Sequence, residues 1–120
     1  MQMFFKKSAF IIIALIISSC SNVLTTKEAA ITDEIKQKKE LINSYSQELL
    51  KDPKNEKLIF DRGIAKYEYG DYKGAINDFD KAFQISKDLG ILYFRAITKV
   101  DYGDYDGALE DYEKLLSIPD

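Results

Sequence analysis

The sequence has no histidine and no tryptophan, and its 120 residues include one cysteine and two prolines. Without histidine the chain has no imidazole general base, no Ser–His or Cys–His dyad, and no ordinary zinc or haem ligand set. The 17 basic and 20 acidic residues give a net charge of −3, so no excess of positive charge is present to neutralise a nucleic-acid backbone. We therefore expect no enzyme, no cofactor or metal site and no nucleic-acid partner.

The N-terminal residues have the pattern of an export signal. Two lysines precede an apolar run over residues 9–17. These nine residues are fewer than the roughly 20 apolar residues that cross a bilayer as a helix. Small and polar residues follow at positions 18–22. The sequence predicts a cleaved signal peptide over residues 1–19, with an uncleaved membrane anchor as the alternative.

The segment Ile17-Ser18-Ser19-Cys20 resembles the lipobox of bacterial lipoproteins, in which an aliphatic residue and two small residues precede a cysteine that takes a diacylglyceryl group. The resemblance implies cleavage before Cys20 and lipid attachment to its sulfur. As the only cysteine, Cys20 has no partner for an internal disulfide. The implied product is an exported protein, lipid-anchored to the bacterial cell envelope. The serine after Cys20 favours the periplasmic side of the outer membrane, if the source has one.

A linker and a first helix are expected after the cysteine. Residues 20–26 show no apolar periodicity and are predicted to form a flexible linker. Thr25 and Glu28 have the spacing of a capping box, which predicts a helix start. An apolar stripe then runs along residues 27–52, and the helix is predicted to end before Asp52-Pro53. The stripe consists of Ile31, Ile35, Ile42, Tyr45 and Leu49.

The remainder of the chain is an internal repeat with a period of 33 residues. Residues 62–85 and 95–118 are identical at 12 of 24 aligned positions. In both copies an apolar helical pattern runs to Tyr-Gly-Asp-Tyr, where the glycine can end one helix and the aspartate can cap the next. Each copy is therefore predicted to be two helices joined by a tight turn. The small residues expected at the helix crossings are Gly63, Ala75, Ala96 and Ala108.

These two units resemble tetratricopeptide repeats. The first reads Ile59-x-x-Arg62-Gly63, Gly70-Asp71-Tyr72 and Ala75-x-x-x-Phe79-x-x-Ala82, and the second reads Leu92-x-x-Arg95-Ala96, Gly103-Asp104-Tyr105 and Ala108-x-x-x-Tyr112-x-x-Leu115. Lys66 and Lys99 stand where the family often has tyrosine. The resemblance implies an all-α fold, a short tetratricopeptide-type helical solenoid with repeats over residues 53–88 and 89–120. The helix over residues 27–52 would be a degenerate half-repeat.

Tetratricopeptide arrays bind peptides or protein segments in a concave groove lined by the first helix of each repeat. The resemblance extends this role to Phe60, Ile64, Tyr67, Glu68, Tyr93, Ile97, Val100 and Asp101. Because their apolar members recur at helical spacing, each set occupies one helix face. Two interpretations stay open: the two stripes form a groove for an apolar or amphipathic peptide, or they are buried as core.

The last helix presents a second candidate surface. Each repeat buries its apolar face against the next, and a terminal unit is usually covered by a helix with a polar outer face. No such helix follows in the sequence, so an apolar patch is expected here, for self-association or docking, with a frayed or truncated end as the alternative. Its members are Tyr112, Leu115, Leu116 and Ile118.

Two acidic patterns are assigned to the surface. Residues 102–113 partly match a calcium loop, but Tyr102 stands where the first carboxylate is needed. Asp78 and Asp80 could in principle serve acid–base chemistry, but both are expected to be solvated on a repeat helix. The predicted function is a membrane-tethered protein–protein interaction module or assembly scaffold. The alternatives are a structural homo-oligomer and, less favoured, a calcium-dependent module or an enzyme.

Overall fold

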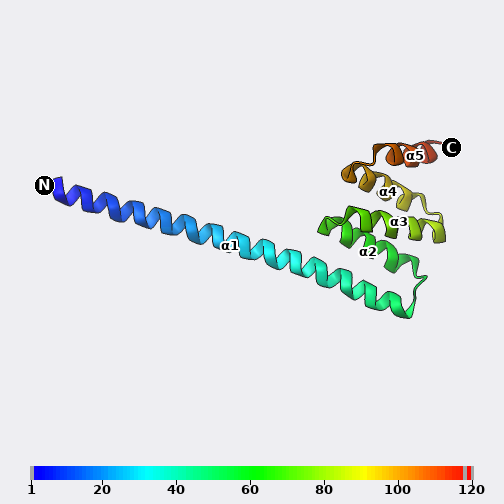
Figure 1. Ribbon diagram of the computed structural model, residues 1–120, viewed down its shortest axis with the longest axis horizontal. Helices are drawn as coiled ribbons and strands as arrows, with labels where there is room; N and C mark the ends of the chain where they lie inside the picture. Colours follow the sequence, from blue (N-terminus) through cyan, green and yellow to red (C-terminus); the bar gives the residue numbers. More distant parts are fainter. Residues whose placement is uncertain (1, 118, 120) are drawn as a thin grey trace. The chain divides into compact units, whose positions relative to one another are not determined.

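The computed structural model describes residues 2–117 and residue 119, with side chains from residue 8 onward, and this part of the chain forms helices without any strand (Figure 1). The predicted all-α class is confirmed. The helices are α1 (Gln2–Lys51), α2 (Glu56–Tyr69), α3 (Tyr72–Ser86), α4 (Leu89–Tyr102) and α5 (Tyr105–Leu116). The chain divides into two compact units, Met1–Lys36 and Gln37–Asp120, and α1 contributes to both.

Helix α1 is continuous through residues 20–26, so the predicted flexible linker is wrong. The predicted capping box is also absent, because the Thr25 hydroxyl donates to the carbonyl oxygens of Ser21 and Asn22 at 3.1 and 3.0 Å. This is how serine and threonine are accommodated inside helices. The sequence has no glycine or proline before Pro53, so no strong helix breaker separates the apolar segment from the amphipathic one.

The tight turns inside the two repeats have the predicted geometry. Gly70 ends α2 and Gly103 ends α4, each with a φ of 90°, a left-handed conformation that glycine adopts without strain. Asp71 and Asp104 then cap α3 and α5, since each side chain accepts the backbone N–H three residues later, at 2.9 and 3.0 Å. The repeated Tyr-Gly-Asp-Tyr sequence therefore builds the same helix–turn–helix twice.

Consecutive helices from α2 to α5 pack side by side (Figure 1). All four small residues predicted at the helix crossings are buried. At Gly63 the approach is so close that an added Cβ would lie 2.7 Å from the Phe79 ring. The core of the second unit is contributed by four helices, α1 to α4, and consists of Leu49, Ile59, Ala75, Phe79, Ala82 and Ile91.

The stripe predicted for residues 27–52 is used in two different ways. Leu49, near the end of α1, is only 8% exposed and joins the core, whereas Ile31 and Ile35 in the N-terminal unit are 48% and 49% exposed. The C-terminal part of α1 also contacts α2 through the Ser46 hydroxyl, which accepts a hydrogen bond from Nη1 of Arg62 at 3.3 Å. Burial of the stripe therefore begins where the second unit begins.

A buried ion cluster joins the two helices of the first repeat, and it overturns the surface assignment of Asp78. The Asp78 residue is 1% exposed. Arg62 donates from Nε and Nη2 to its two carboxylate oxygens, both at 2.8 Å, and Nζ of Lys66 lies 2.8 Å from Oδ2. The carboxylate is thus paired with two cations, and the attraction and hydrogen bonds offset the desolvation cost of the buried charge.

The second repeat contains the same cluster. Arg95 donates from Nε and Nη2 to Asp111 at 2.9 and 2.7 Å, and Nζ of Lys99 lies 2.9 Å from the same carboxylate. Burial raises the pKa of the Asp111 carboxyl, but the hydrogen bonds from Arg95 and Lys99 outweigh it and hold that pKa below its ordinary value. Lysine at the position where the tetratricopeptide pattern often has tyrosine therefore supplies the second cation of the cluster.

A further ion pair connects the two repeats. The remaining terminal nitrogen of Arg95, Nη1, donates to Oδ1 of Asp80 on α3 at 2.5 Å. The same guanidinium lies 5.5 Å from the ring centroid of Phe83, in a cation–π contact. Arg95 therefore both closes its own repeat and fixes α4 against α3.

Candidate functional site

The apolar side chains of the N-terminal unit are exposed. Phe10 is 78% exposed, and the large apolar residues over 11–17 are between 54% and 64% exposed. Burying such side chains is favourable by about 25 cal/mol per Å² of apolar surface. Because they are exposed, these side chains do not contribute this stabilisation to the fold of the chain. This segment therefore offers an apolar surface to an environment outside the protein.

One helix in the described part of the chain has the length and composition of a membrane span. It lies within Ser8–Lys51, where an 18-residue window has a mean hydropathy of 2.0 and no buried residues. The uninterrupted apolar run over residues 9–17 is shorter than this window, because the uncharged residues 18–22 separate it from the apolar Val23 and Leu24. A signal sequence near the N-terminus meets the same test, so the helix is compatible with a signal peptide or a membrane anchor.

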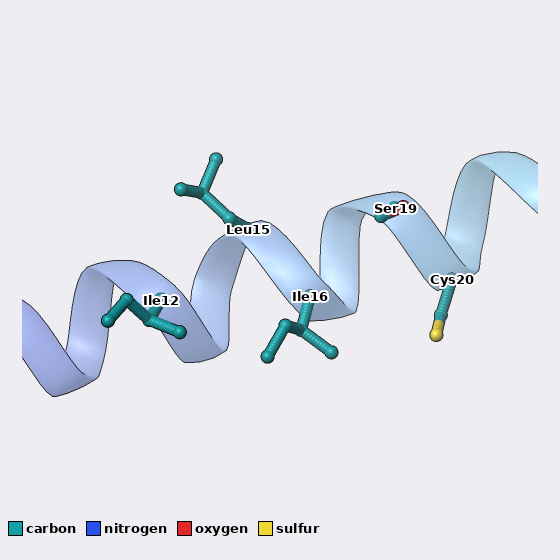
Figure 2. Close-up of a pocket in the computed structure, with 5 residues that line it drawn as sticks. All are labelled: Ile12, Leu15, Ile16, Ser19 and Cys20. Carbon is teal, nitrogen blue, oxygen red and sulfur yellow. The ribbon is translucent and has the colours of Figure 1, made fainter.

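Cys20 lies within this apolar surface, one helical turn before Val23 and Leu24, and is accessible. The thiol is exposed and forms no disulfide. Figure 2 shows its side chain on the same side of the helix as Ile12 and Ile16, and a shallow cavity of about 300 Å³ lies along this face. The lining residues are Ile12, Leu15, Ile16, Ser19 and Cys20. An enzyme that modifies the sulfur could therefore approach it without unfolding the helix.

The groove candidates of the first repeat are largely engaged in packing. Phe60, Ile64 and Tyr67 are half-buried and pack against the core cluster. The Phe60 ring lies 5.6 Å from the ring of Phe79 and 5.4 Å from that of Phe94, measured between centroids. Among these candidates on α2, only Glu68 is exposed. The three aromatic and aliphatic side chains thus occupy the packing role that the sequence left as the alternative.

The groove candidates of the second repeat are more accessible. Tyr93 and Val100 are 50% and 40% exposed, whereas Ile97 is half-buried. Asp101 is exposed and accepts a 2.6 Å hydrogen bond from the Tyr67 hydroxyl, which links α2 to α4 and raises the pKa of Tyr67. Phe94, which the sequence pattern did not indicate, is 42% exposed beside Tyr93. The accessible apolar surface of the predicted groove therefore lies on α4.

The patch predicted on the last helix is partly exposed. Leu116 is 85% exposed, whereas Tyr112 and Leu115 are half-buried. Ile118 lies outside the described residues. Leu109 is also 57% exposed and stands at helical spacing from Tyr112, a signal that its position in the sequence could have supplied.

No group of three or more metal-ligating side chains occurs among the residues that the structure describes. Every buried side-chain nitrogen and oxygen in this part of the chain has a hydrogen-bond partner. A comparison with models of known protein families finds no match, and no curated protein matches the chain.

Proposed function

We propose that the chain is an exported lipoprotein in which acylated Cys20 tethers a short tetratricopeptide-type domain to the bacterial cell envelope, where the domain binds a segment of another protein as an interaction module or scaffold. The observation that carries this proposal is an exposed apolar segment of α1 over residues 9–17, followed three residues later by the chain's only cysteine, itself exposed. Acyl chains add about 0.8 kcal/mol per buried CH₂, so more than one chain on Cys20 would anchor the protein stably.

The helical contacts support the tetratricopeptide assignment. Two helix–turn–helix units with a 33-residue period pack in succession, which is the organisation of a repeat array. The contact of Ser46 on α1 with Arg62 corresponds to the contact of Asp80 on α3 with Arg95. This one shared polar contact, together with Leu49 in the core, supports assigning the end of α1 as a degenerate half-repeat, although α1 packs against α2 less extensively than α3 packs against α4.

The binding proposal is centred on α4. Tyr93 and Val100 together with Phe94 expose aromatic and aliphatic surface, and the carboxylates of Asp101 and Glu68 are also exposed. Aromatic anchors commonly supply most of the affinity at protein interfaces. The preferred partner is therefore a segment that inserts apolar side chains against α4.

Tethering is tested by comparing the wild type with Cys20→Ser during expression in a bacterium that processes lipoproteins. We expect the wild type to incorporate labelled fatty acid and to lose residues 1–19, and the variant to do neither. The proposal is wrong if Cys20→Ser is labelled and processed like the wild type.

Partner binding is tested with the full-length protein in native membranes, by crosslinking and affinity capture with Tyr93→Ala and Val100→Ala. Ile85→Ala, another exposed aliphatic position, serves as the matched control. We expect both α4 variants to lose the partner that the wild type and the control retain, with unchanged thermal stability. Capture at wild-type levels would contradict the proposal, as would unfolding of both variants, since these side chains would then belong to the core.

A further inference from the structure

The outer face of α5 reproduces the face of α3 on which α4 docks. The 33-residue offset of the repeat aligns four residues of α3 with four of α5. The aligned pairs are Phe79 with Tyr112, Asp80 with Glu113, Ala82 with Leu115, and Phe83 with Leu116. Each pair preserves the chemical class: aromatic, acidic, aliphatic and large apolar, respectively.

On α3 these positions receive a defined set of side chains from α4. The ring of Phe79 lies 6.2 Å from that of Phe94, and Asp80 accepts the hydrogen bond from Arg95. Phe83 lies beneath the same guanidinium, while Ala82 is fully buried in the cluster that contains Ile91. Helix α4 therefore presents to α3 the apolar Ile91, then Phe94 three positions later, and then Arg95 directly after it.

On α5 no side chain of the described residues covers the equivalent positions in this way. Tyr112 contacts Tyr93 within its own repeat, as Phe79 contacts Phe60, but it has no counterpart of the Phe94 contact among the described residues. Leu116 is 85% exposed, whereas Phe83 is half-buried. Glu113 is exposed and lines a shallow depression of about 340 Å³ together with Glu110, Lys114 and Ser117. The outer face of α5 therefore combines exposed apolar surface with the carboxylate of Glu113. Glu113 stands at the position that Asp80, which binds Arg95, has on α3.

We propose that the outer face of α5 docks a helix of a partner protein that carries an arginine next to an aromatic residue, in the arrangement that α4 presents to α3. The partner arginine pairs with Glu113, and the aromatic residue packs on Tyr112 and Leu116. This surface adjoins the α4 surface of the proposed function through the contact of Tyr112 with Tyr93, but it requires no partner on α4.

The contacts of this chain's own arginines favour another protein over a second copy. Arg62 and Arg95 each use two nitrogens on the aspartate of their own repeat, and the remaining terminal nitrogen on Ser46 or Asp80. A second copy would have to break these buried ion clusters before it could present either arginine to Glu113. A foreign helix with an uncommitted arginine has no such cost.

The test uses the ¹⁵N-labelled full-length chain in detergent micelles and a helix-stabilised synthetic peptide with the sequence of residues 88–103, which includes Arg95. We expect the wild-type peptide to shift amide resonances of the outer face of α5. The peptide with Arg95→Glu should bind at least about ten-fold more weakly. The Glu113→Arg protein should reverse this preference and bind the Arg95→Glu peptide better. Asp33→Arg, which makes the same charge change in the N-terminal unit, should retain the wild-type preference.

Four results would overturn the proposal. The first is that the peptide shifts amide resonances of α4 or α3 instead of α5, and the second is that the protein binds the two peptides with equal affinity. The third is that no resonance shifts at about 1 mM peptide. The fourth is that α5 resonances shift with protein concentration when no peptide is present. The last result would show that a second copy occupies the face. Because Glu113 is exposed, the Glu113→Arg protein should fold normally, and the peptide with Arg95→Glu tests the charge pairing even without that variant.

Discussion

The two units of the chain use the same apolar residue types in opposite ways. In the repeat unit Phe79 and Leu92 are 0% and 1% exposed, whereas in the N-terminal unit Phe10 and Ile13 are 78% and 54% exposed. The first pair stabilises the fold through packing within the chain, and the second pair does not. The difference indicates that the N-terminal segment is adapted to an apolar environment outside the domain, which the proposed function identifies as the membrane.

The largest expected effect comes from breaking a buried ion cluster of the repeat unit. Asp78→Ala or Asp111→Ala would remove a buried carboxylate from an arginine and a lysine whose side chains are only 9–18% exposed, and should cost about 3–5 kcal/mol of unfolding free energy. Urea unfolding followed by circular dichroism measures this cost. The exposed Asp33→Ala in the N-terminal unit is the control and should change stability by less than about 0.5 kcal/mol. A loss below about 1 kcal/mol in either cluster variant would contradict the structure.

A smaller loss is expected at the helix crossing of the first repeat. Gly63→Ala places a Cβ 2.7 Å from the Phe79 ring and should destabilise the protein by about 1–3 kcal/mol, although alanine favours helices. The second repeat has Ala96 at the equivalent position, so Ala96→Gly should lower stability by about 1 kcal/mol through helix propensity and by roughly 1 kcal/mol more through loss of a buried methyl group. Thermal unfolding measures both variants. Stabilisation by Gly63→Ala would show that α2 and α3 are farther apart than described.

Acid should weaken the repeat unit through Asp111. Since its pKa is lower in the folded protein than in the unfolded chain, the unfolded chain binds the proton more readily. The stabilisation from this group is complete above the unfolded pKa of about 3.9 and is lost as the pH falls through the folded value. Urea midpoints measured between neutral pH and pH 3 should fall less in Asp111→Asn than in the wild type. Equal falls would show that Asp111 is not the responsible group.

The hydrogen bond between the repeats should contribute little. Tyr67→Phe removes the hydroxyl that donates to Asp101 and should lower the unfolding free energy by about 0.5–1 kcal/mol, because the bond is exposed. Tyr69→Phe is the matched control at an exposed tyrosine on the same helix, and chemical denaturation compares the two. Equal stability of the two variants would mean that this contact does not stabilise the pair of helices.

The smallest effect on folding is expected in the apolar segment. Ile13→Asn should change the unfolding free energy of the repeats by less than about 0.5 kcal/mol but should impair export or membrane association. Leu92→Ala should do the reverse, with a loss of about 2–5 kcal/mol and normal membrane association. Unfolding measurements combined with cell fractionation test both. If Ile13→Asn destabilises the repeats, the contrast between the two units is wrong.

The features that the sequence predicted correctly depend on local chemistry. Gly70 and Gly103 end their helices because a left-handed residue is needed there, and the aspartates that follow are natural caps. The linker prediction was also local, but it was wrong because serine and threonine can bond back along a helix when no glycine or proline interrupts it.

The features that the sequence did not predict depend on contacts between helices. Asp78 appeared to be surface charge because its partner Arg62 lies sixteen residues away and meets it only when the turn closes. The repetition of arginine, lysine and aspartate in both units was the available signal. Helical spacing likewise placed Phe60 and Tyr93 on corresponding faces, but their exposure depends on the neighbouring helices.

The most direct test of the central claim is the intact mass of the full-length gene product, expressed with its native N-terminus in a lipoprotein-processing bacterium and purified from the membrane. The account predicts a chain that begins at Cys20 and carries the added mass of acyl groups on that residue. A chain that retains residues 1–19 with an unmodified Cys20 would contradict it, and the apolar helix would then be a membrane anchor.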